Sequence, residues 1–336
     1  MNAPALSPSP SPSPWIAVCR ASNVRAKPYR VEIDGMALVL FRSAQGLAAF
    51  PDICPHRLAP LSRGRIVAGQ LECAYHGWRF DGAGQCQAMP GLIGEVPRVR
   101  LAPWQVREQD GLIFVAREAS DTLPYGGRLT GTGMARVVTA SETRSTVAEV
   151  AENILDATHT HFIHKGLLRG LSSRRYRVIV TLSGGPGWVE ARYEGETRQE
   201  GVLSRLLEGQ RGISVGRFLA PGIAEIEFWS PRRIELATTF HLRQAAPDCV
   251  AGLGVLAGPG DGGLGWVKAA LFRPLFDMAV AQDRHILAAV TDNRARFDGI
   301  KPVIGPLDLL RPSIDAILAG ELPPLAGAPR TVEIEL

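Results

Sequence analysis

Two short segments of the sequence each bring one cysteine and one histidine close together. Cys54 and His56 are separated by one residue, and Cys73 and His76 by two. Two thiolates and two imidazoles suit a [2Fe-2S] cluster in which cysteines hold one iron and histidines hold the other. Cys2His2 is equally a ligand set for structural zinc. Because zinc fingers tend to pair Cys with Cys and His with His, the order found here favours the iron-sulfur cluster.

The chain around these segments predicts a small antiparallel β domain. Short strand-like runs separated by turns such as Asp34-Gly35 cover the chain from Trp15 to about residue 116. The runs lie at residues 29–33, 37–41, 46–50 and 111–115. We therefore expect both cysteine-histidine loops inside one all-β domain over residues 15–117.

These loops resemble the Rieske domain of the Rieske non-haem iron oxygenases. The resemblance rests on the motifs CPHR at residues 54–57 and CAYHGWRFDGAGQ at residues 73–85. It implies that the two cysteines and two histidines named above bind a Rieske [2Fe-2S] cluster. In respiratory relatives each loop carries an extra cysteine and the two form a disulfide, whereas this chain has Ala59 and Tyr75 at those places. The loops are therefore similar to the oxygenase type.

A second group of candidate residues lies along a predicted helix. Thr146 and Glu149 form a capping box, so this helix should begin near Val147. Three polar side chains then follow at three-residue steps and should project to one broad side of the helix. They are Asn153, Asp156 and His159.

A further histidine, His164, follows His159 by five residues. An unbroken helix would turn these two side chains well away from each other. Both can therefore bind one metal ion only if the helix loosens or ends between them. With His161 between them, the three histidines are equally compatible with a solvated helix end.

The pattern N-x-x-D-x-x-H-x-x-x-x-H over residues 153–164 is similar to the catalytic motif of the same oxygenases and matches it at every defined position. The resemblance implies that His159 and His164 bind a mononuclear Fe(II) and that Asp156 bridges electrons to it. Asn153, the first residue of the motif, is the other candidate catalytic residue. His161 lies off the motif.

A site with two histidines and one carboxylate still needs its carboxylate. Pro274 can open a helix, and Asp283 then falls within an apolar stripe. The stripe consists of Phe276, Ala279, Val280, Ile286, Leu287 and Val290. A lone buried carboxylate is costly unless it is paired or bound to metal. Asp283 is therefore the expected third ligand, with an ion pair to an arginine as the alternative.

Strand-like segments at residues 176–182, 188–193, 223–229 and 234–242 separate these two helices. Helices packed on one antiparallel sheet give an α+β catalytic domain, expected over residues 118–336, and the resemblance implies the helix-grip type. Such a fold can enclose an apolar cavity. Candidate walls, each of which is also a plausible core residue, are Phe218, Phe228, Trp229 and Phe240.

The composition limits the classes of partner and compartment. The 336 residues carry a formal net charge of only +4, and the chain shows no basic run or apolar span, so neither nucleic acid nor a membrane is indicated. The Ser-Pro repeats of residues 1–14 predict a disordered tail. Two of the five cysteines are assigned to the cluster and the others are scattered, which favours a reducing cytoplasm.

Taken together, the two motifs resemble the α-subunit-only monooxygenases that include vanillate and dicamba O-demethylases. This implies a terminal oxygenase that uses O2 to hydroxylate or demethylate a small aromatic or cyclic substrate. It also implies a homotrimer, with electrons supplied by a separate NAD(P)H-dependent reductase carrying flavin and a ferredoxin-type [2Fe-2S] cluster. The alternatives are an electron carrier or redox sensor and a helix-grip protein that binds lipid or sterol.

Overall fold

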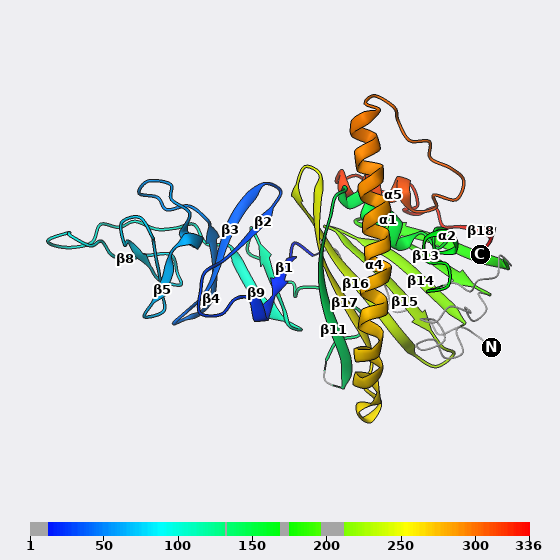
Figure 1. Ribbon diagram of the computed structural model, residues 1–336, viewed down its shortest axis with the longest axis horizontal. Helices are drawn as coiled ribbons and strands as arrows, with labels where there is room; N and C mark the ends of the chain where they lie inside the picture. The colour runs from blue at the N-terminus through cyan, green and yellow to red at the C-terminus, as the bar shows by residue number, and fades with distance from the viewer. Residues whose placement is uncertain (1–12, 132, 169–174, 196–211) are drawn as a thin grey trace. The chain divides into compact units, whose positions relative to one another are not determined.

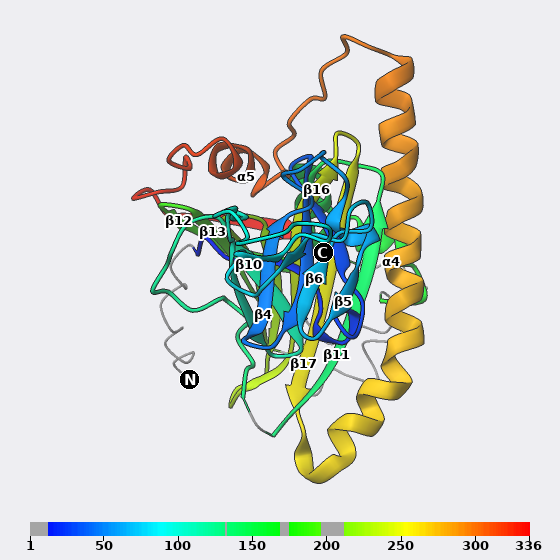
Figure 2. The same ribbon diagram turned by 90° about the vertical axis from the view of Figure 1, so that its left-hand side faces the viewer.

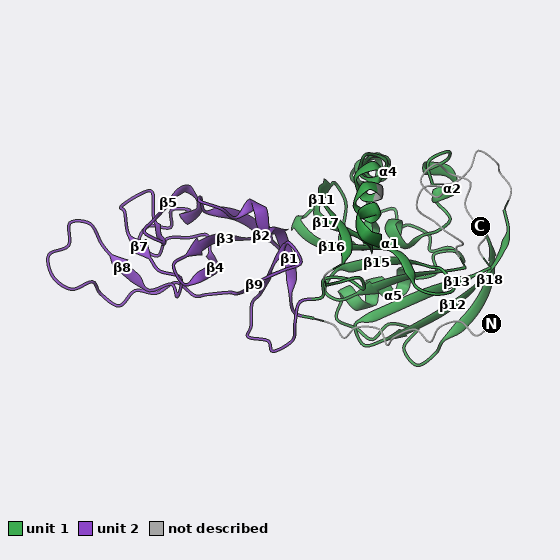
Figure 3. Cartoon of the chain, turned by 90° about the horizontal axis from the view of Figure 1, so that it is seen from below, with its two compact units in different colours: residues 1–13, 125–336 green, residues 14–124 purple. Residues whose placement is uncertain are grey.

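The computed structural model describes residues 13–131, 133–168, 175–195 and 212–336 (Figure 1). The chain divides into two compact units, one of Pro14–Pro124 and one that includes Tyr125–Leu336 (Figure 3). The domain limits expected at residues 117 and 118 stay a prediction, and the connection up to Pro124 belongs to the first unit. The tail expected over residues 1–14 lies, up to residue 12, outside the described residues.

The first unit consists of three small antiparallel sheets, with strand orders β1-β10-β9, β2-β3-β4 and β5-β6-β7-β8. Its strands are β1 (Ile16–Arg20), β2 (Tyr29–Ile33), β3 (Met36–Ser43), β4 (Gly46–Pro51), β5 (Arg65–Val67), β6 (Gln70–Glu72), β7 (Arg79–Phe80), β8 (Cys86–Ala88), β9 (Gln105–Gln109) and β10 (Leu112–Ala116). Two short 3-10 helices lie at Ala21–Asn23 and Leu61–Arg63. The expected all-β architecture is confirmed, and all four predicted runs form strands.

One apolar core of this unit lies directly beneath the cysteine-histidine loops. Cys54 and Cys73 are buried within it, among the rings of Phe41, Phe50 and Phe80. Phe41 and Phe50 alternate along β3 and β4 with Leu40 and Ala49, which are buried in a second apolar core, as the two-residue period of a strand allows. The packing therefore fixes the two cysteines against a rigid base.

The second unit is built on one eight-stranded antiparallel sheet with the order β11-β17-β16-β15-β14-β13-β12-β18. Its strands are β11 (Met134–Thr143), β12 (Arg177–Gly185), β13 (Trp188–Glu194), β14 (Ile213–Leu219), β15 (Ile223–Trp229), β16 (Ile234–Ala246), β17 (Cys249–Pro259) and β18 (Arg330–Glu335). Its helices are α1 (Val147–Leu155), α2 (Thr160–Ile163), η3 (Asp261–Gly263), α4 (Leu264–Arg296) and α5 (Arg311–Leu318). The α+β class is confirmed, and the sequence reasoning had not located β11, β14, β17 and β18.

The long helix α4 stands at one side of the strands (Figures 1 and 2) and contacts β11 and β17, while α1 contacts β14, β15 and β16. Helix α4 begins at Leu264, so the expectation that Pro274 opens it is wrong. Pro274 lacks the N–H that would bond to the carbonyl of Ala270. Both residues are exposed, so water can replace the missing bond. Among the described residues, no helix combines the length and apolar composition needed to cross a membrane.

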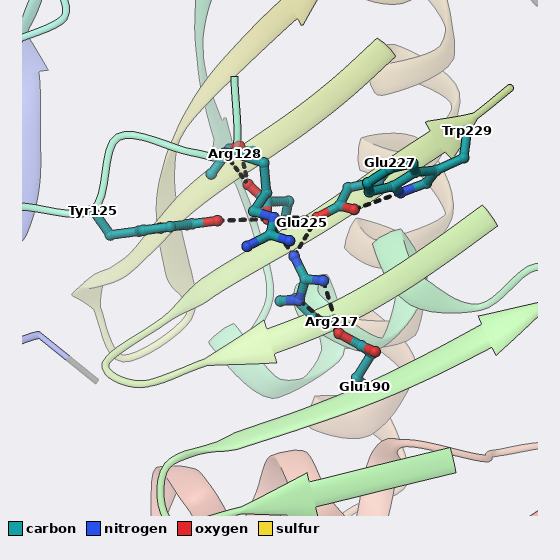
Figure 4. A network of polar contacts seen from close by, with 8 residues as sticks. Tyr125, Arg128, Glu190, Arg217, Glu225, Glu227 and Trp229 are labelled. Carbon is teal, nitrogen blue, oxygen red and sulfur yellow. Dashed lines mark hydrogen bonds and ion pairs between the residues drawn. The ribbon is translucent and has the colours of Figure 1, made fainter. Parts of the chain in front are cut away.

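The face of the sheet that points away from helix α1 carries a buried ionic network (Figure 4). Glu190, Arg217, Glu225 and Thr239 occupy directly opposed positions on β13, β14, β15 and β16, so their side chains form one row across the sheet. The guanidinium of Arg217 donates to Glu190 at 2.7 Å and to Glu225 at 2.8 Å, and it also pairs with Glu227. Arg217 is fully buried.

The network also holds the segment that enters this unit. The Tyr125 hydroxyl donates to Glu225 at 2.7 Å, and the guanidinium of Arg128 pairs with Glu227 at 3.1 Å. Burial and the adjacent Glu225 raise the pKa of Tyr125, and burial raises the pKa of Glu225 itself. Buried carboxylates outnumber the arginines, so the network depends on its central cation.

We expect Arg217→Met to lower the free energy of unfolding by about 3–5 kcal/mol, because three carboxylates would lose their central partner. The measurement is urea unfolding at pH 7 and pH 5. The deficit should shrink at pH 5, because a carboxyl whose pKa is raised in the folded state takes up a proton on folding and then contributes stability at low pH.

The matched control is Arg233→Met, which removes an exposed pair between Arg233 and Asp261 and should change stability by less than about 1 kcal/mol. Equal losses in the two variants would contradict a structural role for the network.

Candidate functional site

The two cysteine-histidine loops share one backbone conformation. In the first loop, the N–H of Cys54 donates to the carbonyl of Ala59 at 2.8 Å, and the N–H of Leu58 donates back to the carbonyl of Cys54 at 2.9 Å. The second loop repeats this pattern, with Cys73 bonding to Trp78 and Gly77 bonding to Cys73. The two ligand pairs are thus presented by two copies of one turn.

The fourth residue after each cysteine has a left-handed backbone, with φ of 60° at Leu58 and 70° at Gly77. Glycine adopts this conformation without strain, whereas leucine does so at a cost. A Cβ at position 77 would also lie 2.9 Å from the ring of Pro90. Gly77 was readable from the sequence as a turn residue, but nothing at Leu58 indicated the matching conformation.

The side chains of the four residues form an inner and an outer pair. Cys54 and Cys73 are buried, and burial together with the neighbouring Cys73 raises the pKa of the Cys54 thiol to about 11. His56 and His76 are exposed, with ring centroids 4.5 Å apart. The ring of Trp78 stacks on His56 at a centroid distance of 4.5 Å.

This arrangement fits a two-iron cluster better than a single zinc ion. Among the described residues, the one group of at least three Cys, His, Asp or Glu side chains placed to hold a single metal ion lies in the other unit. The four residues of these loops therefore do not converge on one ion. Two buried thiols with two exposed imidazoles match a [2Fe-2S] cluster whose histidine-held iron faces outward.

The convergent group consists of His159, His164 and Asp283. Helix α1 ends at Leu155, and the short helix α2 begins at Thr160. The helix therefore ends before Asp156, so the expectation that it carries Asp156 and His159 and breaks between the two histidines is wrong. His159 and His164 flank α2 as its N-cap and C-cap residues.

Asp156 shapes the turn between the two helices. Its carboxylate accepts hydrogen bonds from the backbone N–H and the hydroxyl of Thr158, both at 2.7 Å, and from the N–H of His159 at 3.2 Å. The described contacts of Asp156 thus hold His159 in place.

At the start of α1, the predicted cap is present, because the Thr146 hydroxyl accepts from the N–H of Glu149 at 3.4 Å.

The three convergent atoms are all hydrogen-bond acceptors. Nδ1 of His159 bonds to the carbonyl oxygen of Asp156 at 2.7 Å, and Nδ1 of His164 bonds to Oε1 of Gln282 at 2.8 Å. Since both partners are acceptors, each Nδ1 carries the proton and each Nε2 presents a lone pair. The two Nε2 atoms lie 3.3 Å apart.

Asp283 completes the group. Its Oδ1 lies 3.1 Å from Nε2 of His164 and 3.5 Å from Nε2 of His159, and it is buried without a hydrogen-bond donor. Burial raises the pKa of Asp283, but the two histidines outweigh this and hold it below its usual value. Two imidazoles and one carboxylate with converging lone pairs fit Fe(II) bound by a facial triad.

The other sequence candidates have distinct environments. His161 is half-buried and lies outside the convergent group. Asp277 faces Arg273 at 3.7 Å, and the carboxylate of Asp292 pairs with Arg144 at 2.8 Å, so neither carboxylate joins the convergent group.

A cavity of about 210 Å³ lies beside the triad, between α1, α4 and the sheet. Asn153 and Asp156 contribute to its lining, together with His159, His164 and Asp283. Of the candidate walls, Phe228 and Phe240 line the cavity, whereas Phe218 packs in the core and Trp229 bonds to Glu227 of the ionic network. On α4, the stripe was partly wrong, because Ile286 and Val290 are exposed and the buried face uses Phe272, Phe276 and Leu287.

The first unit matches the family model for the Rieske [2Fe-2S] domain over residues 14–99. Among curated relatives, the oxygenase component of dicamba O-demethylase from Stenotrophomonas maltophilia is 34% identical over 65% of this chain and 63% of its own length. Methylxanthine N3-demethylase from Pseudomonas putida is 35% identical over 46% of this chain and 48% of its own length.

A third relative, 4beta-methylsterol monooxygenase from Methylococcus capsulatus, is 44% identical over 26% of this chain and 25% of its own length. The chain thus spans less than two thirds of the length of the curated relatives it matches. The crystal structure of dicamba monooxygenase bound to dicamba has the same fold, with a TM-score of 0.73 at 21% identity, covering 91% of this chain and 95% of that one.

We expect Asp283→Ala to lose the mononuclear metal, because two neutral imidazoles alone hold Fe(II) weakly. The visible spectrum of the iron-sulfur cluster should stay unchanged, since its ligands lie in the other unit. Iron content measured beside that spectrum tests this, and a variant that retains the mononuclear iron would identify another residue as the third ligand.

We expect Gln282→Leu to weaken metal binding by about 10–100-fold, because His164 would lose the acceptor that holds its Nδ1 proton and orients its ring. Fe(II) affinity measured by anaerobic titration tests this. Gln282→Glu keeps an acceptor oxygen at the same position and should retain the affinity. Unchanged binding in Gln282→Leu would remove Gln282 from this role.

Proposed function

We propose that the chain is a terminal oxygenase component of the Rieske non-haem iron oxygenase family, because its first unit matches the Rieske [2Fe-2S] domain and demethylases are among its relatives. It uses O2 and electrons from a separate NAD(P)H-dependent reductase to hydroxylate or demethylate a small aromatic or cyclic substrate. The observation that carries this proposal is the convergence of three metal-ligand atoms, from His159, His164 and Asp283, at the wall of a cavity.

In this proposal each metal group has a defined set of ligands. Four side chains hold the Rieske [2Fe-2S] cluster, and the two histidines and Asp283 hold Fe(II). The cluster's ligands are Cys54, His56, Cys73 and His76. When bound, the cluster supplies single electrons and the mononuclear iron activates O2.

The remaining residues act by position. The carbonyl of Asp156 and the amide oxygen of Gln282 accept from Nδ1 of His159 and His164, so Nε2 of each neutral ring presents its lone pair to the metal. Asn153, on α1, lines the cavity. The largely apolar walls keep water from the reacting carbon atom.

Demethylation follows from the same chemistry as hydroxylation. One oxygen atom of O2 enters a C–H bond of a methyl group on oxygen or nitrogen, and the other leaves as water, with two electrons and two protons consumed. The resulting hydroxymethyl group is unstable. It releases formaldehyde when its carbon-oxygen or carbon-nitrogen bond breaks, leaving the demethylated product.

The electrons come from a partner protein. Residues 258–263 fit the spacing G-x-G-x-x-G, but they begin within the last two residues of β17, which is antiparallel to both of its neighbours. Dinucleotide binding by this motif uses a parallel βαβ unit instead. We therefore assign NAD(P)H oxidation to a separate reductase with flavin and a ferredoxin-type [2Fe-2S] cluster.

We further infer a homotrimer in which His76 of one subunit approaches Asp156 of the next, as the family resemblance implies. Both residues are accessible within the chain, since His76 is exposed and the side chain of Asp156 retains 31% of its exposure. Asp156 also contacts His159 directly through its carbonyl oxygen.

The proposal is tested by reducing the holoprotein without oxygen, admitting air, and offering methoxy-aromatic, N-methyl and polycyclic compounds. Cluster reoxidation coupled to product formation, with formaldehyde from methyl substrates, is the expected result. Reoxidation that no compound converts into product would favour an electron carrier. Binding of sterols or lipids by a protein that retains no iron would favour the binding-protein alternative.

We expect Asp156→Asn to keep both metal groups and the fold while lowering turnover by at least about 100-fold. The amide can still accept from Thr158, but the negative charge between the two redox centres is lost. Product formed per reduced cluster tests this, with iron content and the visible spectrum recorded beside it. Asp292→Asn, an exposed carboxylate on α4, is the matched control, and full activity in Asp156→Asn would exclude the bridging role.

A further inference from the structure

The cavity beside the triad is walled mainly by apolar side chains. Those from the helices include Ile154, Phe272, Phe276 and Val280, and those from the sheet include Ile226, Phe228, Leu236 and Phe240. An apolar lining of this kind stabilises a bound ring system by removing both surfaces from water. The volume of about 210 Å³ far exceeds the ~10–15 Å³ that a single water molecule needs.

The charged groups of the described lining are few. Asp156 and Asp283 already contact the two histidines of the triad. Arg284, the one arginine or lysine in the described lining, is exposed and follows Asp283 on α4. A ligand carboxylate buried in this cavity would therefore lose its hydration without gaining a buried cation, and such a loss is costly.

Several uncharged polar side chains contribute to the lining of the cavity, among them Asn153, Ser141, Thr143 and Thr238. Thr238, on β16, is 6% exposed, and it lines the cavity. Its neighbours across the sheet are Ile226 on β15 and Leu256 on β17, both apolar. A ligand that fills the cavity displaces water from this hydroxyl, so a ligand with a hydrogen-bonding group placed there avoids the cost of leaving the hydroxyl unpaired.

Strand alternation aims this hydroxyl at the cavity. Thr238 lies between Leu236 and Phe240 on the face of β16 that lines the cavity, whereas Thr239 faces the other way and donates to Glu225 of the ionic network. The two adjacent threonines thus lie on opposite faces of the sheet. The hydroxyl of Thr239 is hydrogen-bonded within the protein, whereas the hydroxyl of Thr238 is available to a ligand in the cavity.

We propose that the substrate is an uncharged, largely apolar ring compound bearing a hydroxyl or carbonyl group, and that Thr238 hydrogen-bonds this group. The inference rests on the proposed function, because it names the class of compound that the oxygenase acts on. Thr238 is then a specificity-determining residue, since its hydroxyl would hydrogen-bond one polar group of the ligand at one place on a mainly apolar wall.

Three probes with one skeleton separate the contributions: 6-methoxy-2-naphthol, 2-methoxynaphthalene and 6-methoxy-2-naphthoate. Their dissociation constants are measured at equilibrium on the holoprotein by isothermal titration calorimetry, without electrons or O2. We expect the naphthol to bind most tightly and the naphthoate at least about 30-fold more weakly than the naphthol. A naphthoate that binds as tightly as the naphthol overturns the proposal.

Thr238→Val removes the hydroxyl and keeps the shape of the side chain. It should weaken binding of the naphthol by about 5–10-fold, in line with one hydrogen bond, and leave 2-methoxynaphthalene within about twofold. Thr238→Ser restores a hydroxyl and should restore the affinity for the naphthol. Equal weakening of both probes in Thr238→Val would reduce Thr238 to a packing role and overturn its assignment.

The readout separates this inference from the proposed function. Binding is measured without turnover, so a protein that prefers the naphthol but converts no compound contradicts the oxygenase function alone. A protein that turns over the naphthoate as well as the naphthol contradicts the substrate class alone.

Discussion

Three lone pairs in the second unit face one another, and much of the structure serves to hold them in this position. Nε2 of His159, Nε2 of His164 and Oδ1 of Asp283 lie within 4.8 Å of each other, with no proton assigned between them. Such atoms repel unless a cation lies among them. The arrangement is held because Nδ1 of each histidine is hydrogen-bonded, that of His159 to the carbonyl of Asp156 and that of His164 to the side chain of Gln282.

This constraint accounts for the local shape of both helices. Helix α1 stops at Leu155, before both histidines, and the four-residue helix α2 then separates His159 from His164. Asp156 ends it by accepting hydrogen bonds from Thr158 and from the backbone of His159. Helix α4 supplies Asp283 and Gln282 from adjacent positions, one as the third acceptor and the other as the support for His164.

The sheet contributes by keeping two chemistries apart. The same strands present apolar and hydroxyl side chains to the cavity and an arginine-glutamate network to the other face, because successive residues of a strand point in opposite directions. Thr238 and Thr239 mark this division within one dipeptide. The network then holds Tyr125 and Arg128 of the entering segment, so the face away from the cavity anchors the start of the unit.

Local signals in the sequence indicated the residues and the spacing of both candidate metal sites. The Cys-x-His and Cys-x-x-His pairs, the capping box at Thr146 and the strand-like runs all depend on neighbours within a few positions, and the structure has the strands and the helix start that they predict. The end of α1 is different, because the spacing of His159 and His164 placed a break between the two histidines and the helix ends before both. The tertiary structure decided what depends on contacts across the chain.

Gln282 and His164 meet across 118 residues, and no local pattern indicates that pairing. Glycine is a residue type that signals a left-handed turn in a sequence, as at Gly77, but leucine is not. The left-handed backbone at Leu58 therefore emerges only from the structure, in which its loop repeats the turn around Gly77. The position of the helices on the sheet decides that Phe228 and Phe240 line the cavity whereas Phe218 and Trp229 do not. It also decides that α4 begins ahead of Pro274. Strand periodicity assigns a side chain to a face, but only packing between distant elements determines whether that face becomes core, cavity or ionic network.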